Sequence, residues 1–570
     1  MRPARWGIQL AGAALALLAS PAGLALAGAS PAHGTSAGSS ATASPSVSST
    51  AAGSGSPALS PRPAPSTSSA PLPSSSAQWL TGPPAPRPAR HAGRPRTVAL
   101  AEPARLHKTV VTFAWGGGLA DQMPSLPMFA KYGMHATYFV PSGLVCVLAQ
   151  QQCHRSSPYL TLGDIRKVAA AGNEIGGLSV LHQQLTTTPV AEAKREVCDD
   201  RANLFRWGFR PTDFAYPFAA VNPAVETLTR ACGYNAGLGT GTLRGAGLCL
   251  TCAWAESIPP QDPLDVRTPI EVNSVNTTWT AGTYEHDVRE AQLHGGGWVV
   301  FTIHDICQEN CPLGTTPAIL SEVLSWLAGQ QKAGTTFVET MAAVIGGPVR
   351  PAVPGPAPRR LHGTGVANAR LAAGSGSLPA CFQAANYGHT VASFTYRPGG
   401  GPQGAAAETV RTTRQGSGIA KLLPRMDLGL CAPSVVAGHA YRAGIWYQAS
   451  SQPQMEIYRR TSLGSWVYWT TSPAFPASGS WRHALWQTPT VPAGTTAISF
   501  GLAAKSAGTI TTTDYSLTAA RNYRTLIWIG VLALALAAAG LIGRGHYRYV
   551  RYARAEAAEA LAVQDAEMRS

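Results

Sequence analysis

The sequence predicts an α/β domain, an all-β sandwich and one membrane-spanning helix, in that order along the chain. Residues 108–347 alternate buried-strand patterns with capped helices. Residues 377–520 consist of short alternating segments separated by Gly, Pro and Ser. Residues 525–543 form a charge-free apolar run long enough to cross a bilayer as a helix. With 570 residues, 45% of them hydrophobic, the chain can build two or three domains with real cores.

The first 107 residues show the features of an exported protein. Arg2 and Arg5 precede an apolar run, and Ala25-Leu26-Ala27 offers a small-x-small cleavage pattern, so we expect residues 1–27 to be a signal peptide. An uncleaved membrane anchor is the alternative. Residues 28–107 are mostly Ser, Ala, Pro, Thr and Gly, too poor in large apolar side chains to offset chain entropy. We expect a disordered stalk, either plain or sugar-modified.

The distribution of charge predicts topology and argues against a nucleic-acid partner. The formal net charge is +15, but only 13% of residues are charged, and many of the basic ones lie near the two ends of the chain. The predicted span is followed by a cluster of arginines, which places the tail, residues 544–570, in the cytoplasm. We therefore expect a single-pass cell-membrane protein with extracellular domains.

The ten cysteines all lie between the predicted signal peptide and the span, where oxidising conditions favour disulfides. The local pairs to expect are Cys146–Cys153, Cys198–Cys232, Cys249–Cys252, Cys307–Cys311 and Cys381–Cys431, although sequence alone leaves the connectivity open. The alternative is a four-thiolate zinc site formed by the third and fourth of these pairs.

The first domain alternates strands and helices in the manner of parallel α/β folds. Strand-like runs that are apolar on both faces are expected at Thr109–Trp115, His135–Val140, Asp213–Phe218 and Trp298–His304. Thr161 with Asp164, Thr188-Pro189 and Asn222-Pro223 are predicted to begin three helices. This pattern favours an α/β barrel or a doubly wound sheet, and both folds place functional residues where strands end.

Three strand-end stretches together resemble a known family. They are Thr112–Gln122, Glu174–Thr186 and Trp298–Asp305, and their order is similar to that of the NodB-type polysaccharide deacetylases, carbohydrate esterase family 4. The resemblance covers residues 108–347. It implies a distorted (β/α) barrel and a metal-dependent hydrolase that removes acetyl groups from chitin-like, peptidoglycan or other cell-envelope glycans.

The resemblance also exposes departures at the positions that would hold a metal. The family's first motif is Thr-Phe-Asp-Asp-Gly, with a general base followed by a metal ligand, and here Ala114 and Trp115 stand at the two Asp positions. An alignment that makes Gly118 the motif glycine supplies no carboxylate either. In the second motif Leu178 replaces the first metal-binding His, while His182 matches the second. Of the three implied protein ligands, His182 alone survives.

Other motif positions persist. Tyr216-Pro217-Phe218 corresponds to the third motif, in which the amide of Phe218 would stabilise an oxyanion. His304, followed by Asp305, matches the general-acid motif. Tyr216 and Phe218 are therefore expected at the substrate. Trp115 is expected either in the core or as a platform on which a sugar ring stacks.

These departures decide between two functions. A hydrolytic metal site needs about three protein ligands, so a lone imidazole predicts no cofactor, with zinc or a similar divalent ion bound only if the site is active. Loss of a general base costs a further factor of about 10² to 10⁴ in rate. We expect an impaired family member that binds or scaffolds a cell-envelope polysaccharide. The alternative is an active deacetylase with a non-standard site.

The second domain follows a Pro-rich linker at residues 348–376 and is similar in general character to jelly-roll carbohydrate-binding modules. It carries many aromatic side chains, among them Trp446, Trp466, Trp469, Trp481 and Trp486. Alternation along strands buries about half of such residues. Any one of these indoles is therefore expected first in the core, and the remainder supply possible platforms for a glycan.

Overall fold

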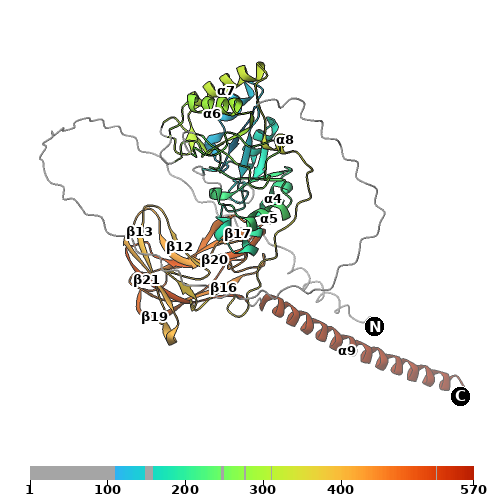
Figure 1. The fold of residues 1–570 in the computed structure, drawn as a ribbon. Helices are drawn as coiled ribbons and strands as arrows, with labels where there is room; N and C mark the ends of the chain where they lie inside the picture. Colours follow the sequence, from blue (N-terminus) through green and yellow to red (C-terminus); the bar gives the residue numbers. More distant parts are fainter. Residues whose placement is uncertain are drawn as a thin grey trace, which may run out of the picture. The chain divides into compact units, whose positions relative to one another are not determined.

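The computed structural model describes residues 109–147, 158–245, 249–274, 278–309, 311–520 and 523–569. The predicted signal peptide, the predicted stalk and Cys153 lie outside the described residues. The described chain comprises an α/β region, a set of antiparallel sheets and a C-terminal helix (Figure 1).

The α/β region is built on one curled sheet of parallel strands. The order is β5-β4-β3-β2-β1-β6, with β9 pairing the first half of β1, so β5 and β6 lie at the two ends of an open half-barrel. The strands are β1 Thr109–Trp115, β2 Thr137–Val140, β3 Glu174–Gly177, β4 Asp213–Ala215, β5 Ala236–Leu238, β6 Gly297–Ile303 and β9 Thr336–Val338. A two-residue pair, β7 Asp305–Ile306 with β8 Gly314–Thr315, follows β6. This curled sheet fits the distorted barrel expected from the sequence.

The helices of this region are α2 Ser125–Ala130, α3 Leu162–Ala170, α4 Val190–Arg206, α5 Pro223–Ala231, α6 Ala281–Leu293, α7 Pro317–Lys332 and α8 Met341–Ile345, with short 3₁₀ turns η1 Ala120–Gln122, η2 Leu185–Thr187 and η3 Pro217–Ala219. Several of these helices begin at capping side chains, whereas α2 and α4 begin after a proline without a side-chain cap. Thr161 and Asp164 form a reciprocal capping box on α3, as predicted. The side chain of Asn222 caps α5, also as predicted. Helices α6 and α7 pack side by side (Figure 1).

Alternation along β1 sends its side chains into two different cores. Val111, Phe113 and Trp115 belong to the large cluster that includes residues of the covering helices. Val110 and Ala114 belong to a second cluster, on the opposite face of the sheet. Both faces of the strand are buried, which explains why its sequence is apolar without interruption.

Helix α4 is amphipathic in an unusual sense, because most of its buried positions are polar. Its buried residues include Glu192, Arg195, Glu196, Asp200 and Arg201. Asp200 accepts hydrogen bonds from the amides of Ser142 (2.9 Å) and Leu178 (3.1 Å), which follow β2 and β3. Burial raises the pKa of Asp200 to about 8. The carboxylate of Asp200 on this helix therefore joins the loop after β2 to the loop after β3.

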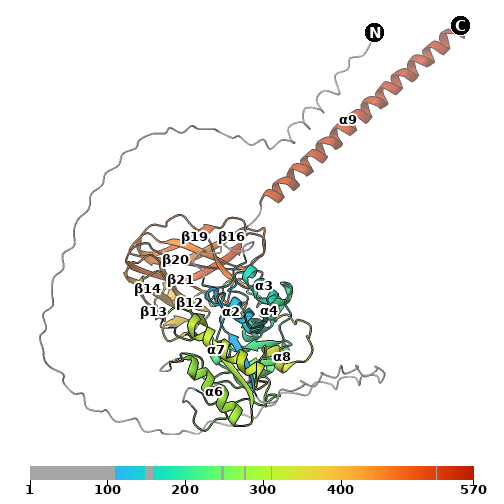
Figure 2. The same cartoon turned by 90° about the horizontal axis from the view of Figure 1, so that it is seen from above.

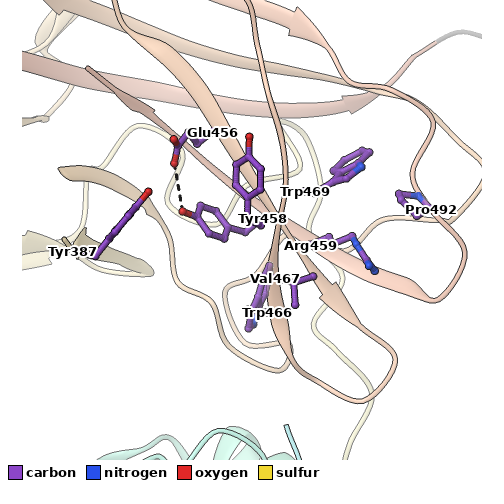
Figure 3. Close-up of a pocket in the computed structure, with 9 residues that line it drawn as sticks. Tyr387, Glu456, Tyr458, Arg459, Trp466, Val467, Trp469 and Pro492 are labelled. Carbon is purple, nitrogen blue, oxygen red and sulfur yellow. Dashed lines mark hydrogen bonds between the residues drawn. The ribbon is translucent and has the colours of Figure 1, made fainter. Parts of the chain in front are cut away.

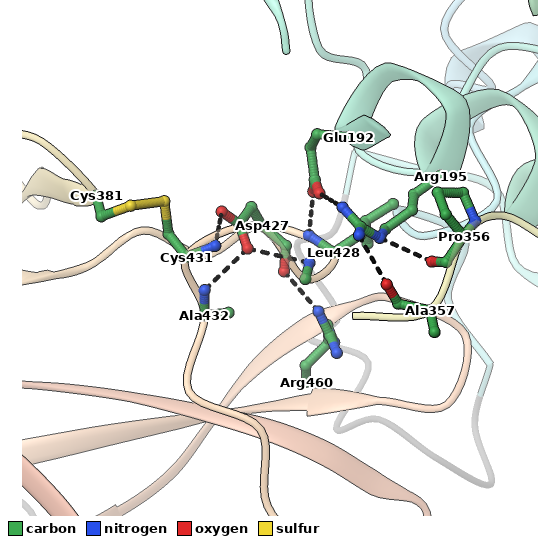
Figure 4. Close-up of polar contacts among 11 residues, drawn as sticks. Glu192, Arg195, Pro356, Ala357, Cys381, Asp427, Leu428, Cys431, Ala432 and Arg460 are labelled. Carbon is green, nitrogen blue, oxygen red and sulfur yellow. Dashed lines mark hydrogen bonds and ion pairs between the residues drawn. A yellow bond between two sulfur atoms is a disulfide. The ribbon is translucent and has the colours of Figure 1, made fainter. Parts of the chain in front are cut away.

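The same helix bonds to the chain that follows the α/β region (Figure 4). Arg195 donates to the carbonyls of Pro356 and Ala357, each at 2.9 Å. Glu192 accepts from the amide of Leu428, a residue between two strands of the second region. The carbonyl of Asp427 next to it accepts from buried Arg460 at 2.8 Å.

The second region consists of antiparallel sheets around one core, as predicted (Figure 2). The sheets are β13-β14-β21-β16-β19, β18-β17-β20 and the pair β12-β15, with a small hairpin β10-β11. Their bounds are β10 Gly374–Ser375, β11 Leu378–Pro379, β12 Phe382–Asn386, β13 Val391–Arg397, β14 Ala407–Arg414, β15 Ala420–Pro424, β16 Tyr441–Ala449, β17 Gln454–Thr461, β18 Trp466–Thr471, β19 Ser478–Gln487, β20 Thr495–Ala503 and β21 Gly508–Ala519, with a 3₁₀ turn η4 Pro402–Gly404. Val366 and Leu371, from the stretch expected to be linker, pack into this core.

Four of the five expected disulfides are present: Cys198–Cys232, Cys249–Cys252, Cys307–Cys311 and Cys381–Cys431. The fifth involves Cys153, which lies outside the described residues. The two short pairs take up the four cysteines that the alternative zinc site required, so the thiolates are committed to disulfides instead.

The C-terminal helix α9, Tyr523–Glu567, is long and apolar enough over part of its length to cross a membrane. It continues beyond the predicted span through the arginine-rich tail.

The bonds of Asp200 predict a large effect of its removal on stability. Asp200→Ala should lower the free energy of unfolding by about 2–5 kcal/mol, because it leaves the buried amides of Ser142 and Leu178 without their acceptor. Urea unfolding followed by circular dichroism measures this. Lys194→Ala, on a less buried position of α4, should change the stability by less than about 0.5 kcal/mol. Equal effects of the two substitutions would contradict the role given to Asp200.

Candidate functional site

The parallel pairing of β1 with β6 brings His304 against a glycine loop. The two strands pair along their whole length, and the amide of Gly116 adds a bond to Ile303 O at 2.9 Å. His304 is the first residue after β6. A Cβ atom on Gly116 would lie 2.7 Å from its imidazole, so this close approach requires glycine.

A buried glutamine locks these two strand ends together. The Nε2 of Gln122 donates to the carbonyls of Gly116 (2.5 Å) and His304 (2.7 Å). Gln122 is fully buried in the turn η1. The glycine loop is therefore fixed by hydrogen bonds that do not depend on a metal.

His182 lies in the loop after β3, beside Phe218. Its backbone is in the left-handed region, with φ 56°, and its amide donates to Ser179 Oγ at 2.9 Å. The rings of His182 and Phe218 meet edge to face, 4.7 Å between centroids. Burial, and secondarily the charge of His304, lower the pKa of His182. The two imidazoles are thus near enough to interact electrostatically, and they share one site.

Carboxylates surround His304. Its Nε2 lies 3.4 Å from Oε1 of Glu271, and both side chains are about one-quarter exposed. Asp305 hydrogen-bonds to Asp121 of η1. Partial burial and the neighbouring Asp305 raise the pKa of Asp121 to about 6. Asp121 therefore keeps its proton to a higher pH than an ordinary aspartate, and Glu271 can orient the imidazole of His304.

Apolar side chains occupy the positions where the resemblance would place metal-binding and basic groups. Ala114 and Leu178 belong to the same buried cluster. Trp115 is fully buried on the other face of β1, where its ring stacks on Tyr138 with 6.1 Å between centroids. Within the described parts of the chain, no three His, Cys, Asp or Glu side chains come together as ligands of a metal. The donor set therefore does not fit a divalent ion.

Trp115 and Tyr216 are both buried, so for Trp115 the structure favours the core over the sugar platform. The indole of Trp115 has no exposed face on which a sugar could stack. Tyr216 is 3% exposed, and its hydroxyl donates to Leu264 O at 2.7 Å. Phe218 differs, since it is 65% exposed beside His182. Its backbone has φ 58°, and the hydrogen bonds of this turn are donated by the next two residues, Ala219 and Ala220.

Sequence reasoning missed three residues that shape the site. Glu271 lies in a segment without regular secondary structure and carries no motif signal. Gln122 ends the first of the three strand-end stretches, Thr112–Gln122, and nothing in the sequence indicates a structural role for its side chain. Glu196, buried on α4, accepts from the amide of Leu181 at 2.8 Å, and burial raises its pKa to about 8. Glu196 and Asp200 are four residues apart and therefore share one face of α4. Sequence reasoning missed them because a polar helix face is ordinarily expected to face solvent.

A comparison with family models identifies part of the first domain. Residues 108–237 match the model of the polysaccharide deacetylase family. This part of the chain is a NodB-type polysaccharide deacetylase region. The match covers the ends of β1 and β3 and the turn η3, and it stops before His304 and Asp305.

Solved structures of deacetylases are also similar to the chain. Peptidoglycan deacetylase PdaC from Bacillus subtilis is 19% identical, with 42% of this chain and 90% of that chain covered and a TM-score of 0.25. A putative polysaccharide deacetylase from Mycobacterium smegmatis is 16% identical over 42% and 90%, with a TM-score of 0.31. A family 4 acetyl xylan esterase from Clostridium thermocellum is 17% identical over 41% and 90%, with a TM-score of 0.27. No curated protein sequence matches the chain.

The Asp121–Asp305 pair of this deacetylase domain makes a prediction about pH. The carboxyl carbon of Asp121 should titrate near pH 6 in a ¹³C NMR experiment, and Asp305→Asn should lower that pKa because it removes a neighbouring charge. The folded-state pKa lies above the ordinary value of 3.8. The stabilising contribution of protonated Asp121 is therefore complete below about pH 4 and lost as the pH rises through about 6. Titration of Asp121 near its ordinary pKa would contradict the pairing.

Proposed function

We propose that this chain is a membrane-anchored cell-surface member of the polysaccharide deacetylase family that binds a cell-envelope polysaccharide without metal-dependent deacetylation. The observation that carries the proposal is the replacement of donor residues by Ala114, Trp115 and Leu178, two of which pack into one apolar cluster. An apolar cluster cannot hold a divalent ion or lower the pKa of its water.

What remains of the site supports binding. The ring of His182 contacts the exposed ring of Phe218, and His304 is close enough to His182 to affect its pKa; all three follow the carboxyl ends of strands, where folds of this kind bind ligands. Imidazole and carboxylate groups hydrogen-bond to sugar hydroxyls, and an exposed aromatic ring packs on the apolar face of a pyranose. These groups need no metal to do so.

The membrane anchor and its orientation belong to the proposal. Helix α9 is a candidate span by length and composition. The arginines that follow the apolar segment favour a cytoplasmic C-terminus, with both folded domains outside the cell. The disulfides are compatible with that placement, because they persist in oxidising compartments.

A second candidate function is deacetylation by a non-standard site. The placement of Glu271 beside His304 favours it, as does the raised pKa of Asp121 next to Asp305, since carboxyl and imidazole groups are the usual acids and bases of hydrolysis. In that case His304 and the Asp pair would serve as acid and base. The residues at 114 and 178 would be irrelevant to the chemistry.

An assay of acetate release separates the two functions. Purified full-length chain in detergent is incubated with chitohexaose and with acetylated peptidoglycan, with and without added zinc, and free acetate is measured. We expect no release above a matched His304→Ala sample. Phe218→Ala should weaken retention on peptidoglycan by several-fold, because it removes the exposed ring beside His182. Acetate release that His304→Ala and Asp121→Asn abolish would establish the second function instead.

A further inference from the structure

A cleft on the second domain lies apart from the deacetylase site. It is bordered by strands β17 and β18 and by the turn after β12, and its volume is about 710 Å³ (Figure 3). Aromatic rings line it: Tyr387, Tyr458, Trp466, Tyr468 and Trp469. Its volume falls in the range of ligand pockets, about 300–1,000 Å³.

Two of these rings are exposed without any contribution to the core. Tyr387 is 50% exposed and Tyr468 is 52% exposed. Tyr458 meets Tyr468 edge to face, with 5.9 Å between centroids. The core of the domain is formed by other residues of the same strands, such as Met455 and Ile457 of β17. Exposed aromatic side chains gathered around a cleft mark a binding surface rather than a packing need.

The cleft also has a polar border. The side chain of Lys421 is fully buried, and its Nζ lies 2.8 Å from Oε2 of Glu456. The ammonium sits over the rings of Tyr387 (5.0 Å) and Tyr458 (4.9 Å), a cation–π arrangement. The hydroxyl of Tyr458 donates to the same Oε2 at 3.3 Å. The buried ammonium of Lys421 thus holds the carboxylate of Glu456 and the rings of Tyr387 and Tyr458 in place.

The fixed aromatic rings and the ion-paired carboxylate of Glu456 together favour a sugar as the ligand of the cleft. The apolar face of a pyranose ring, lined by C–H groups that carry partial positive charge, complements the negative face of a tyrosine or tryptophan ring. Its hydroxyls can donate to the carboxylate of Glu456, whose described hydrogen bonds both end on Oε2. The charge of Lys421 offsets that of Glu456, and Arg459, which also lines the cleft, adds a guanidinium that can donate to sugar hydroxyls.

We propose that this cleft binds a pyranose polysaccharide, with sugar rings stacked on Tyr387 and Tyr468 and a hydroxyl bound by Glu456. The inference deepens the proposed glycan binding, but it concerns a separate site in a different domain. It holds whether or not the deacetylase domain releases acetate. A Pro-rich peptide is the other ligand that aromatic grooves accept. The carboxylate border favours the sugar, because an extended proline segment offers it few donors.

The test uses the full-length chain in detergent and isothermal titration with chitohexaose, cellohexaose and xylohexaose. At least one of the three should bind. Tyr468→Ala and Tyr387→Ala should each weaken that binding about tenfold, while Tyr468→Phe should retain it because the ring face is kept. Tyr468 is half exposed and is not one of the rings beneath Lys421, so Tyr468→Ala should keep the melting temperature of the parent chain, whereas Tyr387→Ala also removes a cation–π partner of Lys421 and should lower it slightly.

Trp446→Ala is the matched control. Trp446 is a 36% exposed indole on β16, and it stacks on His483 outside the cleft, 5.2 Å between centroids. Its removal should leave the dissociation constant unchanged.

Three outcomes would overturn the inference. The first is that none of the three hexasaccharides binds. The second is binding that survives Tyr387→Ala and Tyr468→Ala but is lost in Phe218→Ala, which would place the glycan in the deacetylase domain and leave the proposed function standing. The third is competition by a Pro-rich peptide, for which the probe is a synthetic peptide of residues 81–98 from the predicted stalk: if it displaces the hexasaccharide from the cleft, the ligand is a peptide. Acetate release would contradict the proposed function alone, so the two failures are distinguishable.

Discussion

The rest of the fold depends on the hydrogen bonds made by the buried polar residues of helix α4. Asp200 and Glu196 bind the amides of the loops after β2 and β3, and Arg195 and Glu192 bind the segments that follow the α/β region. A cysteine of the same helix is tied to the end of α5 by Cys198–Cys232. Since buried polar groups are costly unless they are hydrogen-bonded, these segments are held in one arrangement.

The candidate site follows from that framework rather than from a metal. The loop carrying His182 is held through Leu181 and Leu178 by α4, and the loop before η1 is held by Gln122. In a metal-dependent hydrolase the ion itself helps to fix such loops. Here hydrogen bonds and an apolar cluster do so.

The sequence predicted the fold well where local chemistry decides the structure. Strand β1 and the start of α3 and α5 were predicted because an uninterrupted apolar run and N-caps act over a few residues. The sequence did not predict on which face of β1 the side chain of Trp115 lies. A strand that is buried on both faces lacks the alternation of polar and apolar residues that would tell the two faces apart. Glu271 and the polar contacts of α4 were missed because their partners are distant in sequence, and only the folded chain brings them together.

The central claim is that this deacetylase domain lacks the donors for a resident divalent ion, and metal binding tests it most directly. The full-length chain, equilibrated with zinc and then dialysed against metal-free buffer, is analysed by inductively coupled plasma mass spectrometry beside a His182→Ala variant. The account predicts no stoichiometric zinc in either protein, because among the residues that the structure describes no three His, Cys, Asp or Glu side chains come together as metal ligands. One zinc ion per chain in the parent protein that is lost in His182→Ala would contradict the account.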